Sequence, residues 1–186
     1  MSDEPALIAA VLAAPGDDTP RLVYADWLQE NGDPTRAEFI RLQYRRWRGE
    51  WGTEHLEREQ ALLRAYRQAW VGLPVLGRGA EEESWGFRRG FPECLWVHGP
   101  ALLRWHREFA RVVWVREVFV LSAAPRAVTE LPRLEWGRNW DSLTLRADGL
   151  FRVYATPGML GALAACPQAG RLARLHLGQR LGVALD

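Results

Sequence analysis

Residues 19–43 read TPRLVYADWLQENGDPTRAEFIRLQ, and this stretch decides how the rest of the chain is interpreted. Thr19 followed by Pro20 is a helix start signal, because a capping side chain stands before a residue whose φ is already helical. Asp33 followed by Pro34 repeats that signal, and Gly32 just before it is a typical helix stop. The stretch therefore predicts two helices joined by a tight corner, an αα-hairpin.

Further helices are expected on either side of this hairpin. Apolar residues at helical spacing predict one helix over residues 4–14 and another over residues 53–71. Residues 72–86 are rich in glycine and acidic residues, which indicates a linker or a loop. The sequence thus divides into a helical module (1–72), a linker or loop (73–86) and a second part (87–186).

The second part carries a short αβ pattern that recurs along the chain. Four strand-like apolar cores end at residues 97, 120, 145 and 177, so they are separated by 23, 25 and 32 residues. A step near 25 residues with one strand and one helix in each unit is typical of leucine-rich repeats, although the asparagine expected after each strand is missing. An unrelated α/β layer would give similar steps. Helices are expected over residues 101–112, 127–134 and 158–166.

Composition restricts the classes of protein that the chain can belong to. Its 186 residues are 48% hydrophobic with a formal net charge of +1, which is typical of a folded domain and gives no reason for strong attraction to nucleic acid or membrane. The basic residues are all arginine. The N-terminus lacks the basic start of a signal peptide, and no run reaches the roughly 18 apolar residues of a membrane span. With two distant cysteines expected as buried free thiols, we expect a cytoplasmic protein.

The segments TPRLVYADWL (19–28), GDP (32–34) and AEFIRLQ (37–43) resemble the repeat-companion domain, a short module that precedes leucine-rich-type repeats in many planctomycete proteins. The FRRGF sequence at residues 87–91 is similar to the entry into the repeats of that family. The resemblance implies a bacterial protein with a helical cap joined to a small αβ solenoid. It implies no activity, because none is established for the family.

The most motif-like residues of the hairpin allow two interpretations. Tyr24, Asp26 and Trp27 could line a ligand pocket, or they could hold the hairpin together, with Trp27 in the core and the polar groups bonded across the corner to the Asp33 turn or to an arginine such as Arg41. We favour the structural role and expect Leu22, Val23, Trp27 and Leu28 to face the core. The corner itself is formed by Gly32, Asp33 and Pro34.

Catalytic and metal-binding patterns are not recognisable in the sequence. The four histidines lack the spacing of metal ligands, and there is no nucleophile elbow, phosphate-binding loop or dinucleotide fingerprint. We therefore expect a protein that is not an enzyme and that needs no cofactor or metal.

A binding surface follows from the alternation of side chains along the strands. If the leucines and valines of each strand core face inward, the residue between them faces the opposite side of the sheet. Trp96, Phe119, Thr144 and His176 then form one column, with His98, Leu121 and Arg146 on one side of it and Arg174 on the other. Aromatic and arginine side chains are typical of protein-binding hot spots. The alternative is that the helix over 53–71 or the 72–86 segment covers this face.

These observations predict a non-enzymatic adaptor or accessory subunit that docks another protein through the sheet face and through an open last strand near Leu175. The alternative is an accessory subunit that contacts nucleic acid. It would use a basic and aromatic cluster on the helix that ends near residue 48, together with two arginines of FRRGF. The cluster on the helix comprises Arg41, Tyr44, Arg45, Arg46, Trp47 and Arg48, and the two arginines of FRRGF are Arg88 and Arg89.

Overall fold

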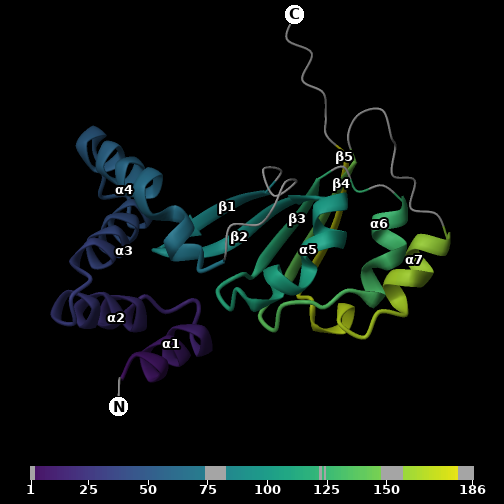
Figure 1. Ribbon diagram of the computed structural model, residues 1–186, viewed down its shortest axis with the longest axis horizontal. Helices are drawn as coiled ribbons and strands as arrows, with labels where there is room; N and C mark the ends of the chain where they lie inside the picture. Colours follow the sequence, from purple (N-terminus) through teal and green to yellow (C-terminus); the bar gives the residue numbers. More distant parts are fainter. Residues whose placement is uncertain (1–2, 74–82, 122, 124, 148–156, 180–186) are drawn as a thin grey trace, which may run out of the picture. The chain divides into compact units, whose positions relative to one another are not determined.

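The structure, a computed structural model, describes residues 3–73, 83–121, 123, 125–147 and 157–179. The chain divides into two compact units: a helical unit of residues 1–71 and 87–92, and a sheet unit of residues 72–86 and 93–186. The fold is mixed α/β, with seven α-helices and one five-stranded sheet among the described residues (Figure 1). The FRRGF sequence thus groups with the helices rather than with the strands that follow it.

The helical unit contains the αα-hairpin that the sequence predicts. Asp33 is the N-cap of the second hairpin helix, and its Oδ1 accepts a hydrogen bond from the backbone N–H of Arg36 at 2.9 Å. The first hairpin helix begins at Thr19 itself, with Asp18 rather than Thr19 as N-cap. The Thr19 N–H donates to Asp17 Oδ1 at 2.9 Å. The four helices are α1 (Glu4–Ala13), α2 (Thr19–Glu30), α3 (Pro34–Trp47) and α4 (Thr53–Val71).

The buried face of α2 differs from the expected one. Val23 is 46% exposed, and Leu22 and Trp27 are only partly buried. The expectation that these three face the core is wrong for Val23 and only partly right for the other two. The helix turns inward the face that carries Tyr24 and Arg21, because both of these side chains pack on the ring of Phe91 from the FRRGF sequence. An apolar stripe chosen from the helix alone could not include an arginine.

The FRRGF sequence forms the tip of a β-hairpin between β1 (Glu83–Arg88) and β2 (Phe91–His98). Its two turn residues both have positive φ, 47° at Arg89 and 94° at Gly90, as a tight two-residue hairpin turn requires. The Gly90 N–H donates to Gln43 Oε1 at 2.8 Å. Because β1 begins at Glu83, the last four residues of the segment expected to be a linker belong to a strand. Residues 74–82 of that segment lie outside the described residues.

A buried arginine lies among the aromatic rings of the helical unit. Arg36 is 6% exposed, and its guanidinium carbon lies 4.6 Å from the ring centroid of Trp70 and 5.7 Å from those of Phe87 and Phe91. Burial lowers the pKa of Arg36 to about 10, and the nearby Tyr24 and Asp33 groups oppose this shift. Cation–π contacts thus take the place of a carboxylate partner and join the hairpin tip to the helices.

The sheet unit is built from strands that follow one another in space as they do in sequence. The sheet order is β1-β2-β3-β4-β5, and β2 to β5 are parallel. The expected strand cores are confirmed by β3 (Glu117–Leu121), β4 (Ser142–Ala147) and β5 (Arg174–Gln179) along with β2. The expected helices are α5 (Gly99–Arg111), α6 (Pro125–Glu130, followed by a 3₁₀ turn at Leu131–Arg133) and α7 (Pro157–Ala164).

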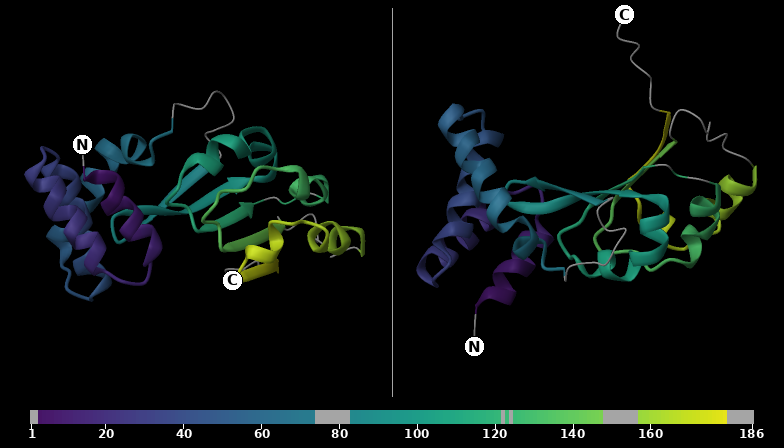
Figure 2. Two further views of the ribbon diagram at one scale, coloured as in Figure 1. Left: turned by 90° about the horizontal axis from the view of Figure 1, so that it is seen from below. Right: turned by 45° about the horizontal axis from the view of Figure 1, so that its top comes forward.

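All three crossover helices lie on the same face of this sheet. Crossovers between parallel strands are right-handed, so crossovers that always lead to the next strand in one direction put their helices on one side. Figures 1 and 2 show α5, α6 and α7 on one side of the strands. The strand residues on that side are almost completely buried: Leu95, Val97, Val118, Val120, Leu143 and Leu145 are 0–2% exposed. We call the opposite side of β2 to β5 the open face.

Candidate functional site

The open face carries the predicted column of residues. Trp96 pairs with Phe119, Phe119 with Thr144, and Thr144 with His176 across the parallel strands. The first three side chains are partly exposed and that of His176 is exposed, whereas the neighbours of the first three on the helical side are buried. Alternation along the strands therefore brings these four residues together, as expected.

Two aromatic rings form the centre of this column. The rings of Trp96 and Phe119 are stacked with centroids 5.0 Å apart and an interplanar angle of 11°. On its other side the indole lies over Gly86 of β1, where an added Cβ would come within 2.4 Å of the Trp96 ring. Gly86 therefore leaves the space that the indole occupies. The sequence reasoning missed this residue because it placed residue 86 in a linker.

The predicted neighbours of the column lie on the expected sides. His98 pairs with Leu121, and Arg146 pairs with Gly178, in the row toward the carboxyl ends of the strands. Arg174 pairs with Ser142 in the row toward the amino ends. The sheet face thus has aromatic residues on β2 and β3, and more polar and cationic residues on β4 and β5.

The row that contains the predicted Arg174 also carries Glu117 and Cys94, which the sequence reasoning did not include in the site. Arg174 Nη2 donates to Glu117 Oε1 at 2.9 Å, and the Sγ of Cys94 lies 4.0 Å from Glu117 Oε2. Glu117 is 9% exposed, so this ion pair is buried at the acid and exposed to solvent at the arginine. The signal that could have found it is the same alternation, because Glu117 stands two residues before Phe119. The pair orients Arg174 beside the aromatic centre.

The alternative prediction was that one of two segments, residues 53–71 or residues 72–86, covers this face. Of the 72–86 segment, residues 83–86 are part of β1 in the same sheet, and residues 74–82 lie outside the described residues. The other segment, residues 53–71, belongs to the helical unit. The partial exposure of Trp96 and Phe119 distinguishes them from the core residues of the same strands.

The last strand in the sheet order, β5, has apolar side chains at its surface. Leu175 is 45% exposed and Leu177 is 41% exposed, although their partners Leu143 and Leu145 on β4 are buried. Exposed leucines on an edge strand are a feature of surfaces that associate with another chain. Residues 180–186, which follow this strand, lie outside the described residues.

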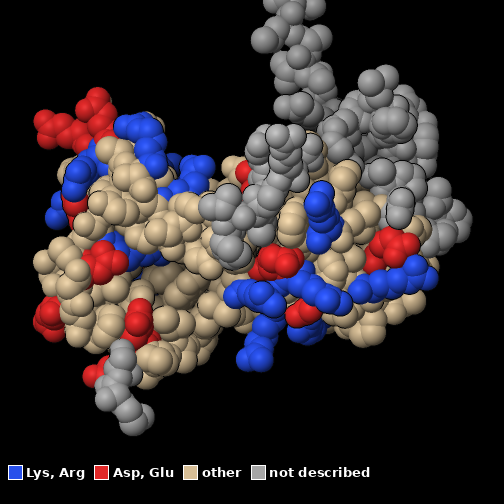
Figure 3. Space-filling model, viewed as in Figure 1, with Lys and Arg blue, Asp and Glu red and all other residues tan. Residues whose placement is uncertain are grey.

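The arginines predicted for nucleic acid do not form one basic strip. Arg41 pairs with Asp26 at 2.7 Å, and Arg48 lies 3.8 Å from Glu50, so two of the positive charges are balanced locally. Arg45 is exposed and Tyr44, on the same helix, is partly buried. On the face drawn in Figure 3, basic and acidic residues alternate over the helical unit.

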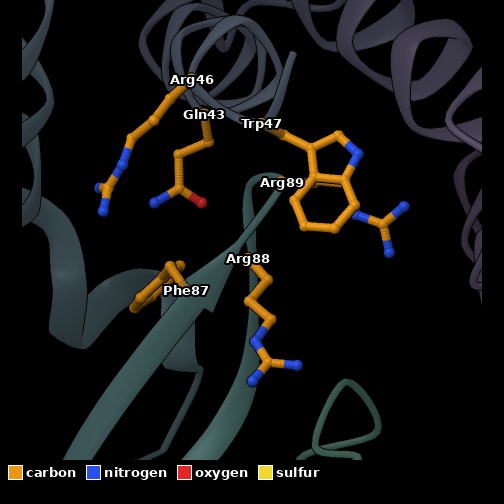
Figure 4. Close-up of a pocket in the computed structure, with 6 residues that line it drawn as sticks. All are labelled: Gln43, Arg46, Trp47, Phe87, Arg88 and Arg89. Carbon is orange, nitrogen blue, oxygen red and sulfur yellow. The ribbon is translucent and has the colours of Figure 1, made fainter. Parts of the chain in front are cut away.

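The other three arginines of that set lie together at a pocket of the helical unit. The pocket has a volume of about 230 Å³ and is formed by the end of α3 and the tip of the β-hairpin (Figure 4). Trp47, the last residue of α3, has a side chain that is 64% exposed. The lining residues are Gln43, Arg46, Trp47, Phe87, Arg88 and Arg89.

The motif residues of the hairpin have structural partners. The Tyr24 hydroxyl donates to Glu4 Oε1 at 2.9 Å, and its ring is stacked on Trp27 with centroids 6.1 Å apart. Burial, together with this bond, raises the pKa of Tyr24 above its ordinary value. Asp26 Oδ1 accepts from Arg41 at 2.7 Å, the cross-helix bond that the structural interpretation allowed. Tyr24 bonds to α1 rather than across the corner.

Groups suited to metal binding or membrane insertion are absent from the part of the chain that the structure describes. No three His, Cys, Asp or Glu side chains there could hold a metal ion together. None of the described helices combines the length and the apolar character needed to cross a membrane. Both cysteines, Cys94 and Cys166, are buried free thiols, as expected.

Comparison with known protein families, with characterised proteins and with solved structures finds no match for this chain. Its site is therefore interpreted from the residues alone. The arrangement on the open face suits recognition by stacking, apolar contact and hydrogen bonding.

Proposed function

We propose that this protein is a non-enzymatic adaptor or accessory subunit of a larger complex, and that it docks a partner protein on the open face of β2 to β5. The stacked, partly exposed pair of Trp96 and Phe119 is the observation that carries this proposal. Parallel sheets are normally covered on both faces, and here the crossover helices cover only one. A partner that packs on the aromatic pair would supply the second cover.

The composition of the face supports a protein partner. Interface centres are enriched in tryptophan, tyrosine, phenylalanine and arginine and are surrounded by polar residues. The open face has that pattern, since the aromatic pair is followed across the sheet by Thr144 and His176 and is flanked by the Glu117–Arg174 pair. The exposed leucines of β5 alternate with His176 and therefore lie on the helical side of the sheet, where they offer a separate apolar contact at its edge.

The proposal includes a finer description of the fold. We propose that β2 to β5 with their helices are units of a short leucine-rich-repeat-like solenoid, headed by a module of the repeat-companion type. The parallel order of the strands and the helices on one side support a solenoid. The packing of FRRGF on α2 and α3 supports a module that ends with this sequence. A cytoplasmic location agrees with the two free thiols.

A pulldown of tagged protein from the native cell, with and without nuclease, tests the proposed function. We expect a protein partner that resists nuclease, that binds the purified protein at 1:1 stoichiometry, and that is lost with Trp96→Ala or Phe119→Ala. Truncation of an anchor residue costs at least about 2 kcal/mol of binding free energy, or roughly 30-fold in affinity.

The matched control is Trp51→Ala, which removes an indole that is 55% exposed and lies outside the sheet. It should retain the partner. Thermal unfolding separates binding from folding. If a folded Phe119→Ala variant binds the partner normally, the open face is not the docking surface. If the substitution unfolds the sheet, Phe119 is a core residue and not a docking anchor.

A further inference from the structure

The pocket at the end of α3 has a lining of unusual composition. Of the six described residues that line it, three are arginines, two are aromatic and the sixth is the buried Gln43, so none of these six is acidic. Figure 4 shows Gln43 between Arg46 on one side and Trp47 on the other, with Arg88 and Phe87 on the strand that faces them. All six belong to the helical unit.

Arg89 holds this pocket in shape. Its Nη1 bonds to Asp18 Oδ1 at 2.9 Å and its Nη2 to the carbonyl of Pro15 at 2.7 Å, and its side chain is only 13% exposed. Its guanidinium carbon lies 5.1 Å from the ring centroid of Trp47. Arg89 thus supports one face of the indole, and the indole is 64% exposed. A second planar group can stack on the exposed side.

Arg46 is anchored by the buried Glu59 and has further N–H donors that a ligand can use. Its Nη1 donates to Glu59 Oε1 at 2.9 Å, and the same oxygen accepts from the Gln43 amide at 2.9 Å. Glu59 is 4% exposed, whereas the Arg46 side chain is 56% exposed. A guanidinium has five N–H donors, and this side chain is more than half exposed, so donors other than the one bonded to Glu59 can be reached by a ligand. Arg88, which is exposed on β1, lines the same pocket.

We propose that this pocket binds a nucleoside monophosphate unit, with its base stacked on Trp47 and its phosphate held by Arg46 and Arg88. Arginine forks match phosphate oxygens in geometry and charge, and an exposed indole supported by a cation is a stacking platform for a base. The ligand is a single unit rather than a long strand, because the pocket has a volume of about 230 Å³ and brings together one exposed indole and two exposed arginines. This inference is independent of the open face.

Calorimetric titration of the full chain with AMP and with ribose 5-phosphate tests the proposal. We expect saturable binding of AMP, with ribose 5-phosphate about tenfold weaker, the loss that one base–aromatic stack produces. Trp47→Ala should weaken AMP about tenfold and leave ribose 5-phosphate unchanged. Arg88→Gln should weaken both ligands about tenfold. Arg45→Gln, an exposed arginine on the same helix outside the pocket, should change neither.

Three results would overturn the proposal. The first is no saturable binding of AMP or of the other nucleoside monophosphates by protein whose circular dichroism is native. The second is equal binding of AMP and ribose 5-phosphate, which would exclude a stacked base. The third is tighter binding of phosphotyrosine, or of an oligonucleotide whose affinity falls with salt as several phosphate contacts require, which would assign the pocket to a protein or to a strand.

Discussion

The contact between Gly90 and Ile40 gives the sharpest quantitative prediction for the helical unit. An alanine Cβ at position 90 would lie 2.5 Å from Ile40 Cγ1 and 2.9 Å from Ile40 Cα, and the second of these atoms is backbone and cannot rotate away. The position has a φ of 94°, which costs a residue with a side chain about 1–2 kcal/mol. Overpacking adds about 1–3 kcal/mol. Gly90→Ala should therefore lower the free energy of unfolding of this unit by about 2–5 kcal/mol.

Gly32→Ala is the matched control, because Gly32 has a φ of 97° and an added Cβ there would meet nothing within 4 Å. It carries the backbone cost alone, about 1–2 kcal/mol. Urea unfolding followed by far-ultraviolet circular dichroism measures both variants. An equal loss of stability in the two would show that the FRRGF turn does not pack on α3, and the account of the helical unit would be refuted.

Three further predictions concern buried polar groups of the same unit. The pKa of Tyr24 is raised, so folding favours its neutral hydroxyl. The resulting contribution to the free energy of unfolding is fully present below the ordinary tyrosine pKa of about 10, and it is lost as the pH rises further. Absorbance titration at alkaline pH should show one late tyrosine that disappears in Tyr24→Phe; equal titration of all tyrosines would contradict this. Arg36→Lys should cost about 1–2 kcal/mol in thermal unfolding, because an ammonium cannot stack on the rings as a guanidinium does; an unchanged midpoint would exclude the aromatic cage. Glu59→Leu should cost about 1–3 kcal/mol in urea unfolding, because the buried Gln43 amide loses its acceptor, while the exposed Glu57→Leu should cost less than about 0.5 kcal/mol.

The strands and the column on the open face could be predicted because they depend on a local rule. Alternation of side chains fixes which residue of Leu95-Trp96-Val97 faces which side, and parallel pairing in chain order then aligns that residue with Phe119, Thr144 and His176. The corner at Asp33 was predictable for the same reason, since the capping side chain bonds three residues ahead within its own helix.

What the sequence could not reveal depends on residues far apart in the chain. The inward face of α2 is set by Phe91, so an arginine and a tyrosine are buried where apolar periodicity favoured Val23. The exposure of Trp47 follows from the end of α3, and its partner Arg89 is 42 residues away. Of the predicted arginine cluster, Arg46, Arg88 and Arg89 line one pocket because a hairpin turn brings the last two to the helix.

The central claim is that Trp96 and Phe119 form an open surface that a partner protein covers. Oxidative footprinting of the free protein and of the native complex, read by mass spectrometry at these two residues, tests it most directly. The account predicts that both rings react in the free protein, more than the buried Phe109 does, and that both are protected in the complex. Rings that are as unreactive as Phe109 in the free protein, or that react equally with and without the partner, would contradict it.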